Sequence, residues 1–105
     1  MRPFAHPDVA AVPLAAVLHA LSDPDRLALV RNLDSAAEGL SCTDSCGAVR
    51  LPKSTLANHY RVLREAGLVR SRPDGKQVIN TLRRTEIEAR FPGLLEAVLR
   101  AAVPG

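Results

Sequence analysis

The chain has 105 residues, of which 47% are hydrophobic and 3% aromatic, so it suits one domain with a mostly aliphatic core. No stretch approaches the roughly 20 apolar residues that span a bilayer, and we expect no membrane partner. Two cysteines, Cys42 and Cys46, do not make a secreted disulfide framework, and no basic run precedes the apolar N-terminal segment. The sequence therefore predicts a cytoplasmic protein.

The net charge of +3 is unevenly distributed along the chain. Residues 50–76 carry seven Lys/Arg against two acidic residues (+5), whereas residues 1–49 sum to −3 and residues 77–105 to +1. A concentrated basic segment is typical of a surface that binds a polyanion such as nucleic acid. The alternative is a solvated charged face with no partner.

The first third of the chain predicts an arm and two helices. Three prolines within the first 13 residues indicate an irregular N-terminal arm over residues 1–12. Apolar residues at helical spacing predict a first helix over 13–21 and a second that ends near residue 36. In "SDPDR", Ser22 or Asp23 is expected to cap the second helix, with Pro24 in its first turn.

The middle and last thirds predict a helix-turn-helix over 42–66 and a wing over 68–82. Residues 42–49 suit only a short helix; Ser54 or Thr55 is expected to cap the next one, and Gly67 to end it. "PDG" between two β-like runs indicates a hairpin. Thr85 and Glu88 have capping-box spacing, which predicts a last helix over 85–103 that is kinked or restarted at residues 92–93.

This order of elements defines the expected fold class, which is mainly α with a small β-hairpin. Residues 1–105 form a single winged helix-turn-helix domain, and an apolar helix at either end of so small a domain tends to find a partner subunit.

One helix and the wing carry the residues that suit DNA. On the helix over 54–66, Leu56, Tyr60 and Leu63 share one face, and Ser54, Asn58, Arg61 and Glu65 lie opposite. Asn reads adenine and Arg reads guanine in the major groove, while Lys53, Ser54 and Thr55 suit phosphates at the helix N-terminus. His59 falls at the edge of the apolar face, as a boundary residue or a flank contact. Arg70, Arg72 and Lys76 add a second basic element around the hairpin tip.

The segments "LSDPDRLALVRNL" (21–33) and "KSTLANHYRVLREAGLVRSRPDGKQV" (53–78) resemble the ArsR/SmtB family of bacterial transcriptional repressors. The resemblance implies a homodimer held by the first and last helices, bound to palindromic double-stranded DNA. It implies DNA contacts at Ser54, Thr55, Asn58, His59 and Arg61, with Arg72 and Lys76 serving the wing. Asn58 stands where the family often has His, and Arg61 where it often has Lys, so operator preference does not carry over.

Many relatives sense metals, through a Cys-x-Cys site that this chain replaces with "SCTDSCGAV". The i,i+4 spacing of Cys42 and Cys46 suits a metal edge, for Zn²⁺ or Ni²⁺, or a reversible disulfide. Further ligands would come from His6, Asp8 or His19. The alternative is that the cysteines are small core residues. A second family site, built from Asp and His on the last helix, is missing from residues 83–102.

These observations predict a sequence-specific DNA-binding transcriptional regulator that acts as a homodimeric repressor. It either senses a metal, senses thiol oxidation or has no sensor. The alternative is a dimeric winged-helix module that binds a protein. We expect no enzyme, because the sequence shows no paired carboxylates in an apolar setting, no Ser/His/Asp context and no phosphate loop.

Overall fold

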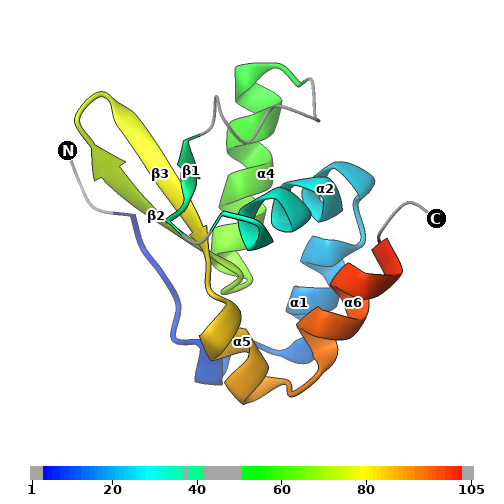
Figure 1. Ribbon diagram of the computed structural model, residues 1–105. Coiled ribbons are helices and arrows are strands. Elements are labelled where there is room, and N and C mark those ends of the chain that lie inside the picture. The colour runs from blue at the N-terminus through cyan, green and yellow to red at the C-terminus, as the bar shows by residue number, and fades with distance from the viewer. Residues whose placement is uncertain (1–3, 37, 42–50, 103–105) are drawn as a thin grey trace.

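A computed structural model describes residues 4–36, 38–41 and 51–102 (Figure 1). Helices pack around a small antiparallel sheet, from which a long hairpin projects as the wing. The predicted short helix over 42–49, with Cys42 and Cys46, lies outside the described residues. The elements are η1 (Val9–Ala11), α1 (Leu14–Leu21), α2 (Pro24–Asp34), β1 (Leu40–Ser41), α4 (Lys53–Glu65), β2 (Val69–Asp74), β3 (Gln77–Leu82), α5 (Arg84–Arg90) and α6 (Leu94–Ala102).

The start of α2 follows the predicted capping pattern. The Asp23 carboxylate accepts hydrogen bonds from the backbone N–H groups of Asp25 (2.8 Å) and Arg26 (3.1 Å). Pro24 occupies the first helical position, where a missing N–H costs nothing. Residues 23–26 thus determine where α1 gives way to α2, through the Asp23 cap and the proline in the first helical position.

The two ends of α4 differ in how well the sequence predicts them. Gly67 has φ +76° and Leu68 N–H donates to the Leu63 carbonyl at 3.0 Å, a glycine-terminated helix end as predicted. The prediction of a Ser54 or Thr55 cap is wrong. Pro52 holds the N-cap position without a side-chain bond, and its carbonyl accepts the first helical hydrogen bond, from Leu56 N–H.

The predicted hairpin is present and has a third strand beside it. β2 and β3 pair antiparallel from Val69 opposite Leu82 to Asp74 opposite Gln77. β1 pairs with the other edge of β3, so the strand order is β1-β3-β2 and β2 is an outer strand. The sequence did not predict β1 because a strand of two residues shows no alternating pattern.

The C-terminal helix is divided in two, as the Pro92-Gly93 pair predicts. The capping box at Thr85 is wrong, because α5 already begins at Arg84 and no side chain caps it. Glu88 instead accepts hydrogen bonds from the backbone N–H groups of Gly93 (3.0 Å) and Glu96 (3.1 Å). Its carboxylate therefore caps the start of α6.

The core lies between the helices and the base of the sheet. Its fully buried side chains come from α1, α2, α4, β2, α5 and α6 and from the turn after α4; the largest are Tyr60, Leu29, Leu33, Leu63, Leu68, Ile87 and Leu95. Among the described residues, Leu14 and Leu18 on α1 are the large hydrophobic residues that stay exposed, each at 45%. Among the described helices, none has the length and apolar character needed to cross a bilayer.

Candidate nucleic-acid interface

The amphipathic pattern of α4 appears in the structure as two distinct faces. Leu56, Tyr60 and Leu63 are buried and hold the helix to the domain. Ser54, Asn58 and Arg61 are exposed on the other side, and Thr55 is half-buried. Of the side chains that the sequence assigns to DNA on this helix, Lys53, Ser54, Asn58 and Arg61 are thus exposed to solvent, whereas His59 is buried.

On this exposed face, Arg61 is held by two neighbours. Its Nη2 donates to Asn58 Oδ1 at 2.6 Å, and its Nη1 pairs with Glu65 Oε1 at 2.8 Å. Pairs of this kind on an exposed helix contribute only about 0.3–0.5 kcal/mol, so a ligand can replace them. Without a ligand, they keep the guanidinium close to the amide.

Three cations predicted to contact phosphates have no counter-charge among the described residues. Lys53, Arg72 and Lys76 are exposed, and none forms an ion pair with another described residue. The first turn of α4, which contains Lys53, and the hairpin turn, which contains Lys76, both lie at the upper end of the molecule in Figure 1. Unpaired positive charge is therefore concentrated where a helix and a wing face the same side.

Two other arginines of the basic segment have internal partners. Arg64 Nη1 donates to Ser71 Oγ at 3.2 Å, and its guanidinium lies 4.5 Å from the centre of the Phe4 ring. Arg70 pairs with Glu86 at 3.3 Å. Hydrogen bonds from Arg83 lower the pKa of Glu86, and burial raises it by less. The charge of Arg83 and the bond and charge of Arg70 lower this pKa further. The sequence counts both arginines as positive charge but cannot show the part-buried bond of Arg64 to Ser71 or the exposed pair of Arg70 with Glu86. Like the pair of Arg61, the pair of Arg70 is one that a ligand can replace.

His59 faces the interior of the domain, away from the exposed polar side of α4. Its side chain is 10% exposed, its Nδ1 lies 3.3 Å from Arg26 Nη1, and its Nε2 lies 4.0 Å from Asp25 Oδ2. Because a guanidinium can only donate, Nδ1 accepts and the proton sits on Nε2. Arg26 is itself buried and also donates to the carbonyls of Ala20 and His19, so this cluster joins α1, α2 and α4.

The donor atoms of Asp23, Asp25 and His59 lie within 4.8 Å of one another, the one such group of three found in the described part of the chain. Asp23 already caps α2, and the Arg26 N–H that it accepts lowers the pKa of its carboxyl. Because His59 accepts the bond from Arg26 at Nδ1, its proton is on Nε2, and Nε2 has no lone pair to offer a metal. The guanidinium of Arg26 already places a positive charge beside this group. We assign no metal to this group.

The predicted metal candidates His6, Asp8 and His19 are not brought together within one chain. Among the described residues, no group of three side chains close enough to hold a metal ion includes any of them. His6 Nε2 accepts from the backbone N–H of Ser71 at 2.9 Å. Asp8 caps η1 through Ala10 N–H, and His19 is exposed on α1. Their predicted partners Cys42 and Cys46 lie outside the described residues.

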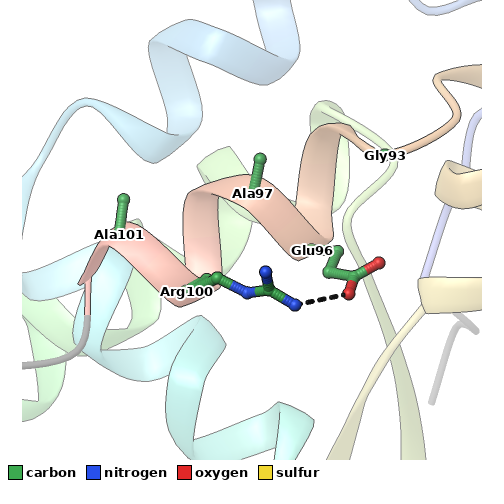
Figure 2. A pocket seen from close by; sticks show the side chains of 5 residues that line it. All are labelled: Gly93, Glu96, Ala97, Arg100 and Ala101. Carbon is green, nitrogen blue, oxygen red and sulfur yellow. Dashed lines mark hydrogen bonds and ion pairs between the residues drawn. The ribbon is translucent and has the colours of Figure 1, made fainter.

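A hollow of about 470 Å³ lies on the surface of α6, lined by Gly93, Glu96, Ala97, Arg100 and Ala101 (Figure 2). Ala97 and Ala101 point to one side of the helix, and Glu96 pairs with Arg100 at 3.1 Å. Side chains as small as Ala97 and Ala101 allow close approach of another helix.

Comparison with known proteins gives the class of this fold. A family model described as a helix-turn-helix domain matches residues 21–72. The HTH-type transcriptional regulator YceK of Bacillus subtilis (strain 168) is 36% identical over 84 residues, which are 80% of this chain and 84% of YceK. The chain is therefore a helix-turn-helix protein of the transcriptional-regulator class.

Solved structures narrow the class to one family. HlyU from Vibrio cholerae N16961 is 31% identical, with a TM-score of 0.65 over 83% of this chain and 88% of HlyU. The transcriptional repressor BigR from Xylella fastidiosa is 27% identical, with a TM-score of 0.61 over 79% of this chain and 84% of BigR. The chain belongs to the ArsR/SmtB family of winged-helix transcriptional regulators. Its relatives are DNA-binding regulators rather than enzymes, and so is this protein.

Proposed function

We propose that the protein is a homodimeric transcriptional repressor that binds a palindromic operator, with α4 in the major groove and the wing on the adjacent backbone. The observation that carries the proposal is the positive charge of Lys53, Arg72 and Lys76 around an exposed polar helix face, since none of the three forms an ion pair within the described part of the chain. The similarity to BigR, which is described as a repressor, supports the sign of regulation. Its place of action is then the cytoplasm, where bacterial operators lie.

The side chains divide by role. Asn58 and Arg61 read base edges, because they are exposed on the middle of α4 and have bidentate geometry for adenine and guanine. To do so, they exchange their mutual hydrogen bond for bonds to bases. Lys53, Ser54, Thr55, Arg72 and Lys76 contact phosphates. His59 supports α4 from behind through Arg26 instead of touching DNA.

Dimerisation is assigned to α1 and α6. Leu14 and Leu18 leave large apolar side chains in water on α1, and α6 presents small residues along its exposed side (Figure 2). Both features are satisfied by a second copy, and a two-fold dimer places two α4 helices about 34 Å apart, on successive major grooves.

The effector that we propose is the one that the sequence suggests, either thiol oxidation or a divalent metal at Cys42 and Cys46. Zn²⁺ or Ni²⁺ would need ligands in addition to the two thiolates. The candidates for these ligands are His6, Asp8 and His19 of either subunit. A metal on His6 would displace the Ser71 N–H that its ring now accepts.

The first experiment titrates reduced protein against DNA from upstream of its own gene, with random DNA as competitor, over a range of salt. Specific binding should resist the competitor and weaken steeply with salt, because phosphate contacts release counterions. The titration is repeated after mild oxidation and with Zn²⁺ or Ni²⁺. Affinity for the fragment no greater than for random DNA would favour a protein-interaction module or an operator elsewhere.

Variants separate reading from positioning. Asn58→Ala should cost about 1–3 kcal/mol on the operator and little on random DNA. Lys76→Ala should weaken both DNAs alike and reduce the salt slope by about one. Glu38→Ala, an exposed residue distant in sequence from α4 and the wing, serves as the control. Equal losses on both DNAs for Asn58→Ala would remove its base-reading role.

A further inference from the structure

One buried arginine connects the last turn of α1 with the middle of α4. Arg26 is 9% exposed and lies at the start of α2, and the three helices pack against one another (Figure 1). Its Nε donates to the Ala20 carbonyl at 2.7 Å and its Nη2 to the His19 carbonyl at 3.2 Å, both in the last turn of α1. Its Nη1 donates to Nδ1 of His59, on α4, at 3.3 Å. A movement of α1 or of α4 therefore acts on the same guanidinium.

Arg26 has little freedom to follow such a movement. Its backbone N–H donates to the Asp23 carboxylate at 3.1 Å in the cap of α2, and the ring of Pro24 restricts the backbone between them. The guanidinium is planar, and its donors point in fixed directions. The bonds of Arg26 to α1 and to His59, which we call the Arg26 link, are therefore a stiff connection between the two helices.

The Arg26 link constrains the rotation of α4 about its axis more strictly than apolar packing does. Hydrophobic burial is non-directional, whereas a hydrogen bond weakens steeply as its angle falls. His59 directly follows Asn58 and precedes Arg61 by two residues. Neighbouring residues of a helix are about 100° apart around its axis. A rotation of α4 that breaks the bond to His59 therefore also swings the two polar side chains to which base reading is assigned.

The other end of the Arg26 link is the helix to which dimerisation is assigned. Val17 and Ala20 of α1 are buried in the domain, whereas Leu14 and Leu18 are exposed at 45% each. In a two-fold dimer, both subunits respond alike, so a rotation of α4 relative to α1 changes the separation and the angle of the two α4 helices. The spacing of the half-sites in an operator mirrors that separation.

We propose that Arg26 and His59 are positioning residues for half-site spacing: through them the end of α1 fixes the rotation of α4, and so the placement of the two α4 helices in the dimer. The spacing role rests on the function proposed above, both the dimer and the operator. The Arg26 link itself rests on the four hydrogen bonds of Arg26 within one subunit.

Two substitutions of His59 test the proposal. His59→Asn keeps an acceptor oxygen next to Cγ, where Nδ1 now stands, and His59→Leu removes the acceptor and keeps an apolar side chain. Leu56→Val is the matched control, because it removes one buried carbon from the same helix and lowers stability without touching the Arg26 link. Arg26→Lys breaks the same bonds from the other side.

The first readout needs no DNA. NMR residual dipolar couplings at pH 8 report the orientation of α4 relative to α1 within a subunit. The couplings of His59→Asn and Leu56→Val should fit the wild-type orientation. In His59→Leu, the couplings of α4 should no longer fit it, while those of α1 and α2 should. A wild-type orientation of α4 in His59→Leu would overturn the Arg26 link.

The second readout is spacing preference. The DNA is the operator that footprinting defines on the fragment from upstream of the protein's own gene, with two derivatives that have one base pair inserted or removed between the half-sites. Each derivative turns one half-site by about 35° relative to the other. The ratio of affinities for the native and the altered spacing should be the same in wild type, His59→Asn and Leu56→Val. In His59→Leu it should fall roughly two- to tenfold, the range that the net contribution of one hydrogen bond gives.

A variant that is only less stable loses affinity for all three DNAs in proportion and leaves the ratio unchanged. A direct contact of His59 with DNA would likewise weaken all three alike in both His59 variants. An unchanged ratio in His59→Leu, or a wild type without a spacing preference, would therefore overturn the positioning role.

Arg26→Lys should lower the ratio as His59→Leu does, and the double variant should lower it no further, because both changes break one bond. Additive losses would show that the two residues act separately and would overturn the shared role; if Arg26→Lys does not fold, the His59 variants decide alone. If the wild type is monomeric or binds no DNA specifically, the proposed function fails and the spacing role with it, while the dipolar couplings still decide the Arg26 link.

Discussion

Arg26 joins three helices through one buried guanidinium. Its Nε donates to the Ala20 carbonyl at 2.7 Å, its Nη2 to the His19 carbonyl at 3.2 Å, and its Nη1 to His59. A lysine has one ammonium and cannot reproduce this fork. Only an arginine side chain can therefore make all three bonds at once.

Arg26→Lys should destabilise the protein by about 1–3 kcal/mol, because buried acceptors lose their donors. Urea unfolding followed by circular dichroism measures the loss. Arg31→Lys, on the same helix but half-buried, should change stability by a few tenths at most. If the two variants unfold at the same urea concentration, the cluster contributes nothing beyond charge.

At the scale of residues, the sequence predicts contacts that are local and misses those that are not. The Asp23 cap is predictable because donor and acceptor lie two and three residues apart. The Arg26–His59 bond joins residues 33 positions apart, and the His6–Ser71 bond spans 65. No local pattern encodes such pairs, so the orientation of His59 and the engagement of Arg64 emerge only from the packed structure.

At the scale of elements, α4 and the hairpin are predictable because each has a period and an end signal, Gly67 for the helix and "PDG" for the turn. The start of the last helix is not, because Thr85 and Glu88 satisfy a motif in the sequence that the chain does not use. Arg83 N–H bonds to the Leu68 carbonyl at 2.8 Å, and this tertiary bond coincides with a helix start two residues earlier than the motif requires, with Arg83 instead of Thr85 at the N-cap.

Glu88→Ala should cost about 1 kcal/mol, since two N–H groups at the start of α6 lose their acceptor. Glu88→Gln should be intermediate, because each bond now uses a different oxygen and an amide has only one. Thermal unfolding gives the values. Thr85→Ala is the control and should be nearly neutral; a larger loss for Thr85→Ala than for Glu88→Ala would restore the capping box.

At the scale of the whole molecule, the charge along the sequence already separates a basic segment, residues 50–76, from an acidic first half. What it does not give is how much of that charge is free. Among the described residues of this segment, Arg64 bonds to the buried Ser71, whereas Arg61 and Arg70 form exposed ion pairs that a ligand can replace. Lys53, Arg72 and Lys76 form no ion pair with another described residue. Among the described cations of this segment, the ones that form no ion pair with another described residue therefore lie at the start of α4 and near the hairpin turn.

The proposed dimer is a property of the whole molecule, and Leu18 is its most direct test. Leu18→Glu places a carboxylate on the exposed apolar side of α1 and should convert dimer to monomer, because burying an unpaired charge is costly. Sedimentation velocity at several concentrations measures this. Gln77→Glu adds the same charge on the exposed wing and should leave the mass unchanged. A Leu18→Glu protein that sediments as wild type would exclude α1 from the interface.

The arm beside β2 also matters for how the protein behaves in a crowded solution. β2 is an outer strand, and the free N–H groups of such a strand are a template on which another chain can add a strand. Here the outward N–H of Ser71 is taken by His6, and the Phe4–Arg64 stack lies next to it. Pro73 further along β2 has no N–H to offer. The contact of His6 with Ser71 and the proline at position 73 therefore leave fewer N–H groups on this edge to which another strand could add.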